Sequence, residues 1–189
     1  MLRPYFFWRI GERAPTLFSG ERSAYNRAMA FTLRSYEPHD FAALHKLDQA
    51  CFPPGISYSK TTLRYFLKLP SADCVVAAEG THIAGFALSE ENPPLAHIIT
   101  LDVEEKQRRN GVGTALLQQL ESNLAARGVR SVLLETAIDN EAAVAFWQRH
   151  GYRIEATLRR YYLARLDAYE MRKLLRPTTK TERHPGEKN

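Results

Sequence analysis

The chain has 189 residues, 44% of them hydrophobic, which is enough to bury the core of one soluble domain. Its formal net charge of +5 comes from the two ends: residues 1–30 carry five Arg against two Glu, and residues 172–189 carry six Lys or Arg against two Glu. Residues 31–171 carry 15 basic and 17 acidic side chains, so the central part lacks the basic excess that binds phosphate backbones. We therefore expect no nucleic-acid binding by the core.

The cysteine and histidine content argues against disulfides and metal sites. Cys51 and Cys74 are far apart with no partner at metal-ligand spacing, and the six His form no close pair. Two free, buried thiols favour a reducing compartment, so we expect a cytoplasmic protein without a metal. No apolar run exceeds six residues, so no membrane span is expected. For the oligomeric state we expect a monomer or a weak dimer.

Both ends are expected to lie outside the folded part. Residues 1–28 mix aromatics, Arg and Pro without clear periodicity, and Met29 stands immediately before the first predicted strand. Two interpretations stay open: an N-terminal extension packed on the domain, or translation that naturally begins at Met29. Residues 177–189 are polar and aperiodic, which predicts a disordered tail. The folded domain is expected to span residues 29–176.

The first half of this domain is predicted to contain a strand, two helices and three further strands. The first strand is AFTLRSY, and PHDFAALHKLDQACF then places apolar residues at helical spacing. Ser59 is a candidate N-cap for a second, short helix. The runs DCVVAAEG and HIAGFALSE are separated by a Gly-containing turn and predict a hairpin. Residues 96–103 (AHIITLDV) predict another strand.

The second half begins with the clearest helix of the chain. This helix runs from Val112 to Arg127 with one apolar face, and Gly128 is its C-cap. The run VRSVLLET predicts a strand, and Asn140 caps the helix EAAVAFWQRH, which Gly151 ends. The runs YRIEATLRRYY and LDAYEMRKLL predict two last strands. This order of elements indicates an α+β fold with a mixed sheet.

The two glycines of QRRNGVGTAL (residues 107–116) lie between a predicted strand and a predicted helix. A Walker A loop is excluded, because it needs four residues between its glycines and a Lys after the second. A dinucleotide fingerprint is disfavoured, because Leu116 stands where Gly or Ala is required and no second parallel unit is evident. What remains is a turn that presents backbone N–H groups to a pyrophosphate, or a turn without a ligand.

The motif RRNGVG (residues 108–113) resembles the Arg/Gln-x-x-Gly-x-Gly/Ala signature of the GNAT acyltransferases, whose loop binds the pyrophosphate of acetyl-CoA. ITLDVEEKQRRNGVGTALL, LLETAIDNEAAVAFWQRHGY and RRYY are similar to segments of RimI-type and eukaryotic N-terminal acetyltransferases, over residues 31–175 or so. The resemblance implies a single GNAT-type domain with a mixed central β-sheet flanked by about four helices, and acetyl-CoA as the acetyl donor. The cofactor-binding residues that it implies are Leu101, Asp102, Val103, Arg108, Arg109, Asn110, Gly111, Val112, Gly113, Thr114, Asn140 and Trp147.

Acetyl transfer to an amine needs a base for the amine and an acid for the departing thiolate. The resemblance implies that Glu135 is the base and that His97 helps to deprotonate the amine. The family's thiolate-protonating Tyr is matched here by Trp147, whose indole N–H is a poor acid, so that role is not carried over. Either Tyr162 or solvent protonates the thiolate. Tyr161 and Tyr162 also resemble the tyrosines that hold a substrate backbone, with the loop from Phe52 to Ser59 as the opposite wall.

The predicted function is acetylation of the α-amino group of a protein or peptide N-terminus, which includes the N-termini of ribosomal proteins. Direct transfer in a ternary complex is preferred over an acyl-cysteine, because Cys51 and Cys74 lie outside the segments that resemble the family. One alternative is acetylation of a small amine such as a polyamine, amino acid or aminoglycoside. The other is a CoA-binding module without turnover. This alternative stays open because Trp147 stands where the family has its thiolate-protonating Tyr.

Overall fold

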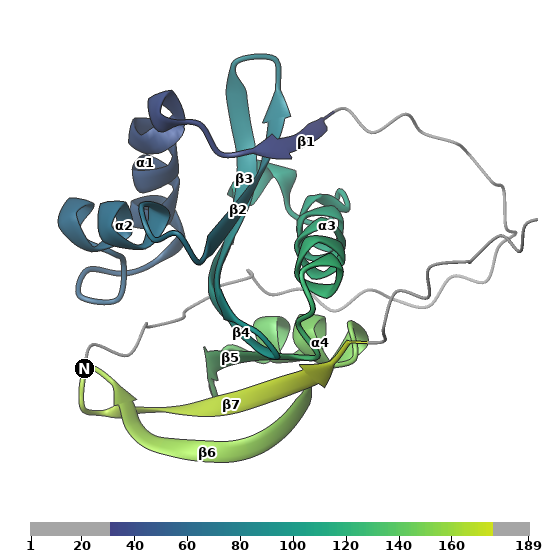
Figure 1. The fold of residues 1–189 in the computed structure, drawn as a ribbon. Helices are drawn as coiled ribbons and strands as arrows, with labels where there is room; N and C mark the ends of the chain where they lie inside the picture. The colour runs from purple at the N-terminus through teal and green to yellow at the C-terminus, as the bar shows by residue number, and fades with distance from the viewer. Residues whose placement is uncertain (1–30, 176–189) are drawn as a thin grey trace, which may run out of the picture.

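The computed structural model describes residues 31–175, so the expected N-terminal extension and C-terminal tail lie outside the described residues. A seven-stranded sheet with the order β1-β2-β3-β4-β5-β7-β6 forms its centre (Figure 1). Its strands are β1 (Thr32–Ser35), β2 (Ala72–Glu79), β3 (His82–Asn92), β4 (Leu95–Val103), β5 (Ser131–Ala137), β6 (Arg153–Tyr162) and β7 (Leu166–Leu174). Neighbours pair antiparallel except β4 and β5, which are parallel, so the sheet is mixed as predicted.

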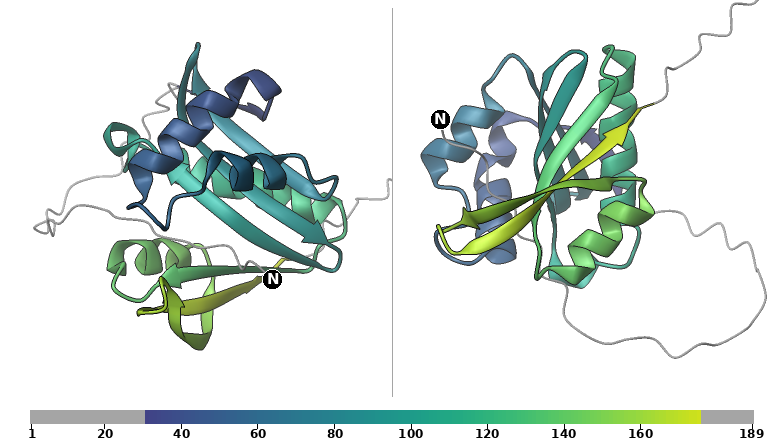
Figure 2. Two further views of the ribbon diagram at one scale, coloured as in Figure 1. Left: turned by 90° about the vertical axis from the view of Figure 1, so that its left-hand side faces the viewer. Right: turned by 90° about the horizontal axis from the view of Figure 1, so that it is seen from below.

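Four α-helices flank the sheet within the described residues, in agreement with the predicted α+β fold. They are α1 (Phe41–Cys51), α2 (Lys60–Leu67), α3 (Val112–Ala126) and α4 (Glu141–Arg149), with short 3-10 turns η1 (Pro38–Asp40) and η2 (Glu105–Gln107). Helices α1 and α2 cover one face of the sheet, and α3 and α4 lie on the other (Figures 1 and 2). Of the helices in this part of the chain, none is long and apolar enough to cross a bilayer.

The predicted helix ends are confirmed by their hydrogen bonds. The Ser59 hydroxyl accepts the N–H of Thr62 at 3.1 Å and starts α2. The Asn140 side chain likewise accepts the N–H of Ala143 at 3.2 Å and starts α4. Two boundaries differ. The first α-helix begins at Phe41 rather than Pro38, because residues 38–40 form the 3-10 turn η1. Helix α3 ends at Ala126, and Arg127 rather than Gly128 is its C-cap.

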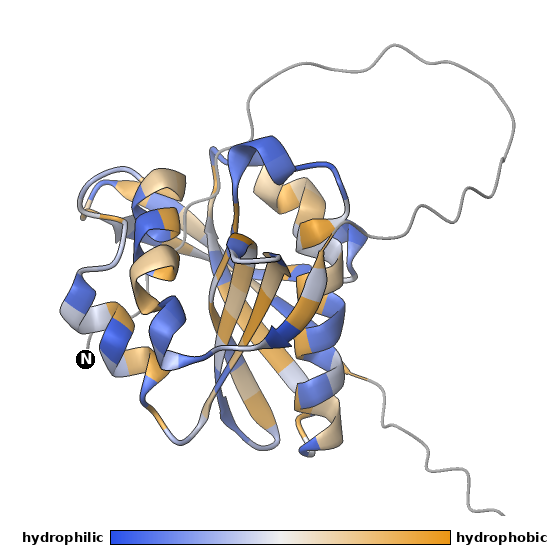
Figure 3. Ribbon diagram, turned by 90° about the horizontal axis from the view of Figure 1, so that it is seen from above, coloured by the Kyte–Doolittle hydropathy of each residue, from blue (hydrophilic) through white to orange (hydrophobic). Residues whose placement is uncertain are grey.

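The core is continuous between the sheet and α3. The predicted apolar face of α3 is buried, and its residues Val112, Leu116, Leu120 and Leu124 are at most 1% exposed. Gly85 of β3 lets the helix approach, since a Cβ there would lie 2.7 Å from the Asp102 carbonyl and 3.0 Å from the Leu116 side chain. Figure 3 shows the hydrophobic central strands between helices whose outward surfaces are hydrophilic.

The sheet opens between β4 and β5. These strands are paired only from Leu95 to His97 on β4, and β5–β7 then turn away from the other strands (Figure 1). A register shift with β3 pairs Leu88 with Thr100 and Ser89 with Ile98, which leaves Ile99 as an extra, bulged residue. A bulge bends its strand. It therefore turns β4 away from β5 immediately after His97.

Candidate functional site

The open edge of β4 is the first component of the site. Within residues 31–175, β5 supplies no ladder partner to β4 beyond His97, so no strand lies beside this edge after that residue. Two of its carbonyls have side-chain partners: Ile99 accepts the Tyr58 hydroxyl, and Val103 accepts Nε of Arg108. An extended ligand can pair with such an edge as an added strand. The side chain of Asp102 is fully buried, so Asp102 can contact a ligand here only through its main chain.

The loop between β4 and α3 is the second component, and it has the geometry of an anion site. Arg109 and Gly111 both have positive φ, at 65° and 84°, and the helix α3 starts at Gly111 with no side-chain cap. The first N–H groups of α3 are therefore open to a ligand, at the positive end of a 15-residue helix. Successive N–H groups in such a turn form a concavity that binds phosphate.

Arg108 supports this loop from inside. Its Nε donates to the carbonyl oxygen of Val103 at 3.1 Å, and its guanidinium lies 3.8 Å from the Cys51 sulfur. The Asn110 amide is exposed and donates to the Gln107 side chain at 3.5 Å. The predicted loop thus holds its shape in part through side-chain contacts.

Thr114, in the first turn of α3, contacts a residue that the sequence reasoning missed. Its hydroxyl lies 3.1 Å from Nε2 of His150, and Nδ1 of His150 donates to the Phe146 carbonyl at 2.8 Å. In the neutral ring Nε2 is therefore an acceptor, and the Thr114 hydroxyl donates to it. No spacing in the sequence signals this contact, because the end of α4 meets the start of α3 only in the folded chain.

His97 and Glu135 form the third component. His97 is in register with Leu133 across the parallel pair, and Glu135 follows two residues later on the same face. A carboxylate oxygen of Glu135 lies 2.7 Å from Nε2 of His97. The side chain of Glu135 is 8% exposed and that of His97 is 23% exposed. Since a carboxylate only accepts, Nε2 carries the hydrogen and Nδ1 of the neutral ring is the acceptor. The structure thus brings together two of the three predicted catalytic residues, His97 and Glu135.

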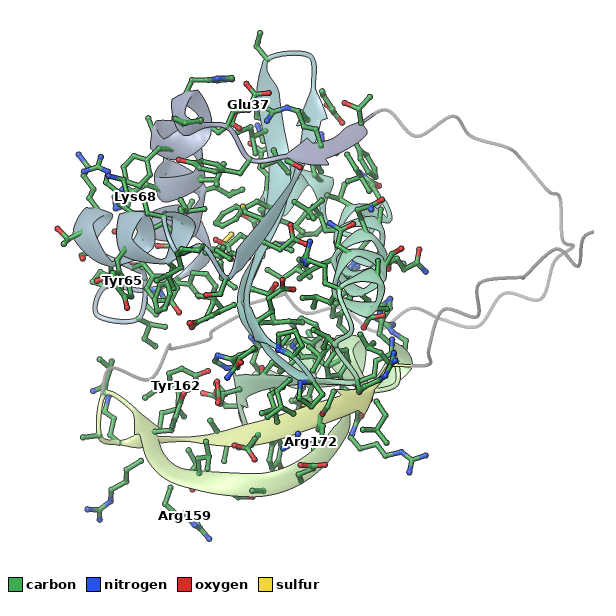
Figure 4. The ribbon with its side chains drawn as sticks, in the orientation of Figure 1. Glu37, Tyr65, Lys68, Arg159, Tyr162 and Arg172 are labelled. Atoms are coloured by element: carbon green, nitrogen blue, oxygen red, sulfur yellow. The ribbon has the colours of Figure 1, made fainter. Side chains whose placement is uncertain are left out.

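Tyr161 and Tyr162 lie at the end of the β6–β7 hairpin. Their rings meet edge to face at 5.0 Å, and Tyr162 is fully buried. Tyr162 extends toward α2, whose exposed Tyr65 lies on the facing side (Figure 4). The hairpin also touches the loop after α1, because a Cβ at Gly55 would lie 3.1 Å from Leu163.

Phe52, the residue predicted for the opposite wall of the substrate site, is 5% exposed and belongs to the hydrophobic core. The loop that follows it reaches Ser59, the cap of α2. Phe52 therefore anchors the start of the loop, and Ile56 and Tyr58 are also buried, so the exposed part of the loop is residues 53–55 and Ser59.

Asn140 and Trp147 lie at the two ends of α4. The Asn140 side chain is 6% exposed, and its amide nitrogen has no hydrogen-bond partner among the described residues. A buried amide with unused donors is costly unless a ligand or water accepts from it. Trp147 is 3% exposed and meets the rings of Phe146 and Tyr152 edge to face at 5.0 and 5.3 Å.

A cleft of about 420 Å³ lies elsewhere, on the α1 side of the sheet. It is lined by one face of α1, by residues 81–83, by residues 104–106 and by Arg108. It includes neither His97 nor Glu135. The cleft therefore borders the β4–α3 loop at residues 104–106 and Arg108, but it does not contain the catalytic pair.

Comparison with known proteins identifies the family of this chain. The model of the acetyltransferase (GNAT) family matches residues 41–152. The chain is 31% identical over 117 residues to N-alpha-acetyltransferase 30 of Schizosaccharomyces pombe, which covers 59% of this chain and 78% of that protein. It is 31% identical over 124 residues to N-alpha-acetyltransferase 30 of Homo sapiens, over 63% of this chain but 34% of that longer protein.

A solved structure agrees with the sequence comparison. The crystal structure of the ribosomal-protein-S18-alanine N-acetyltransferase from Escherichia coli matches with a TM-score of 0.72 and 25% identity, over 80% of this chain and 97% of that one. The chain belongs to the acetyltransferase (GNAT) family.

Proposed function

We propose that this protein transfers an acetyl group from acetyl-CoA to the α-amino group of a protein or peptide N-terminus, directly within a ternary complex. The observation that carries the proposal is the His97–Glu135 pair beside the open edge of β4, at 2.7 Å. The names of the relatives, N-alpha-acetyltransferase and ribosomal-protein-alanine N-acetyltransferase, favour this class of acceptor.

The residues of the site fit acetyl-CoA. The N–H groups of residues 109–114 would hold its pyrophosphate, the main chain of residues 101–103 its pantetheine arm, and the unpartnered amide of Asn140 a carbonyl of that arm. Thr114 and Trp147 belong to the walls that would surround it. When bound, acetyl-CoA supplies the acetyl group as an activated thioester.

His97 and Glu135 would act as one unit on the acceptor. An amine that is protonated near neutral pH must lose a proton before it can attack. Glu135 accepts Nε2–H of His97, so Nδ1 is free to take that proton directly or through one water. The carboxylate then stabilises the imidazolium and holds the ring in place.

The departing thiolate needs a proton from another group. The indole of Trp147 does not supply it, because an indole N–H is not an acid near neutral pH. We propose solvent as the source of this proton, because the phenol of Tyr162, the other predicted donor, is fully buried. Tyr161, which packs on Tyr162, and the loop that ends at Ser59 would hold the acceptor backbone.

The two thiols favour direct transfer. Burial raises the pKa of Cys51 to about 12 and that of Cys74 well above its usual value, so neither is a ready thiolate nucleophile. Both are buried and unpaired, which suits the proposed cytoplasmic location. A monomer or weak dimer stays a prediction.

The test is release of CoA thiol from acetyl-CoA by the purified protein, across peptides with different first residues and a panel of polyamines, amino acids and aminoglycosides. Turnover with free N-terminal peptides, and its loss when the same peptides carry a blocked N-terminus, is the expected result. Turnover on small amines alone would show that the acceptor is a small amine rather than a peptide N-terminus. Acetyl-CoA binding without any turnover would contradict the proposed enzyme activity and favour a CoA-binding module.

A further inference from the structure

Two carboxyl groups are buried between α1 and β4, and the proposed chemistry uses neither. Asp48 and Asp102 are both 0% exposed. The Asp48 Oδ2 atom accepts the N–H of Tyr58 at 2.8 Å and the amide of Gln49 at 3.0 Å. The Asp102 Oδ1 atom accepts the Thr100 hydroxyl. Each carboxyl keeps one oxygen without a partner among the described residues: Oδ1 of Asp48 and Oδ2 of Asp102.

The surroundings of this pair hold little compensating charge. The titratable groups that face it are Arg108 of the loop before α3, Cys51 of α1 and Cys74 of β2. One guanidinium cannot offset two buried carboxylates at low cost. Burial and the nearby charge of Asp48 raise the pKa of Asp102 well above its usual range, and burial raises that of Asp48 to about 7.

Asp102 faces α1, because its neighbours Leu101 and Val103 point toward Gly113 of α3 on the other side of the sheet. Cys51, one turn after Asp48 on α1, contacts the Val103 carbonyl at 3.6 Å, so the two carboxyls face each other and one shared hydrogen atom would satisfy both orphan oxygens. Asp48 receives two N–H donors, which favours its ionised form, whereas Asp102 receives only a hydroxyl. We propose that Asp102 is protonated and donates this hydrogen to Asp48. The pair thereby positions the loop from Phe52 to Ser59, here called the acceptor loop, against β4, the strand proposed to bind acetyl-CoA. Both side chains have a positioning role, since both are fully buried and neither touches a substrate.

The contacts of Tyr58 carry this effect to the site. Its N–H is held by Asp48, its carbonyl accepts the Gln49 amide at 2.8 Å, and its hydroxyl donates to the carbonyl of Ile99 at 3.3 Å. Ile99 is the bulged residue at which β4 leaves β5, two residues after His97. The pair thus closes a ring of contacts from β4 through α1 and the acceptor loop back to β4.

The shared proton is tested by the pH dependence of unfolding. Above the ordinary carboxyl pKa of about 3.9, the unfolded chain has released protons that the native pair retains, so stability falls as pH rises toward the native pKa values. Asp102→Asn keeps a donor to Asp48 but does not titrate. We expect the unfolding free energy of Asp102→Asn, relative to wild type, to increase from about pH 5 to about pH 9.

The control is Asp73→Asn, a substitution of the same chemistry at a carboxylate paired with Arg127. Its difference from wild type should stay constant over this range. A constant difference for Asp102→Asn would overturn the shared proton. If Asp102→Asn does not fold, carbon-13 NMR of the wild-type aspartate carboxyls decides: one protonated carboxyl at neutral pH is expected, and none would contradict the proposal.

The positioning role rests on the proposed function and is tested separately. Asp48→Ala removes the acceptor of the Tyr58 N–H, so the KM for the acceptor peptide should rise about tenfold, while the KM for acetyl-CoA and kcat change less than threefold. Asp48→Asn keeps a side-chain oxygen for this N–H and should restore the peptide KM. Equal losses in all three parameters, or no rescue by Asn, would refute positioning. If no peptide is a substrate, the proposed function fails, while unfolding and NMR still decide the shared proton.

Discussion

His97 and Glu135 differ from a second His–Glu pair in the chain mainly in their exposure. His82 lies 2.8 Å from Glu104, but these side chains are 53% and 34% exposed, against 23% and 8% for His97 and Glu135. Water screens an exposed pair, so its interaction is weak and its geometry is loose. The half-buried pair holds one ring orientation, which is what a base needs.

We predict that Glu135→Gln lowers kcat by about 100-fold, because Gln cannot stabilise an imidazolium at His97. His97→Gln should lower it at least as much. His82→Gln is the matched control and should leave kcat within twofold. The measurement is steady-state acetylation of a preferred peptide, with acetyl-CoA binding measured in parallel. Full activity of Glu135→Gln would remove the carboxylate from the mechanism.

Asn140 allows its two roles to be separated by substitution. Asp at this position keeps the side-chain oxygen that caps α4 but has no amide donor. We predict that Asn140→Asp weakens acetyl-CoA binding about tenfold with little change in thermal stability, whereas Asn140→Ala also loses about 1 kcal/mol of stability. Calorimetric titration and thermal unfolding measure the two effects. Unchanged binding by both variants would leave Asn140 with the cap alone.

The two glycines between β4 and α3, Gly111 and Gly113, differ in how strictly the backbone requires them. Gly111 has a φ of 84°, which an L side chain rarely adopts, whereas a Cβ at Gly113 would have ordinary contacts of 3.5 to 3.7 Å with Phe146, Val103 and Leu101. The sequence motif alone gives both glycines equal weight. In the structure only the first is required by its backbone conformation.

We predict that Gly111→Ala costs about 1 kcal/mol of stability and weakens acetyl-CoA binding, because the strained loop no longer presents its N–H groups together. Gly113→Ala should fold normally and bind acetyl-CoA within about threefold of wild type. Thermal unfolding and calorimetric binding check both variants. A larger loss for Gly113→Ala than for Gly111→Ala would contradict this reading of the loop.

At the scale of the molecule, the site lies between the two parts of the sheet that separate after His97. Acetyl-CoA would contact the β4 edge and the α3 start on one part and Asn140 on the other. A ligand that binds only the native state stabilises it by about 2.7 kcal/mol at a concentration 100 times its Kd. We therefore predict a rise in Tm of several degrees with acetyl-CoA.

Hydrogen exchange locates this effect. Added protection should appear in residues 101–103 and 109–114 and be small in β1 and β2, because the latter lie far from the open edge in the strand order. Protection confined to the α1-side cleft would move the donor site there. Desulfo-CoA, which keeps the pyrophosphate but lacks the thiol, is the control ligand and should protect the same loop.

The helices, the strands and the family motif could be predicted from local patterns of residues. Helix periodicity, the caps Ser59 and Asn140 and the glycine-rich loop depend on residues within a few positions of one another, so they can be read from the chain directly. The expected α+β order and the mixed sheet followed from these elements. The boundary at Phe41 was missed by three residues because Pro38 starts a 3-10 turn rather than the α-helix.

The contacts between residues far apart in the sequence could be seen in the tertiary structure alone. His97 and Glu135 are 38 residues apart, and Thr114 and His150 are 36 apart. Their contacts depend on the register of a parallel strand pair and on helix packing, and neither is encoded in a local pattern. The bulge at Ile99 and the burial of Asp48 and Asp102 also arise from packing across the sheet. Local interactions fix elements, whereas a site needs the positions of several elements at once, which only the packed core sets.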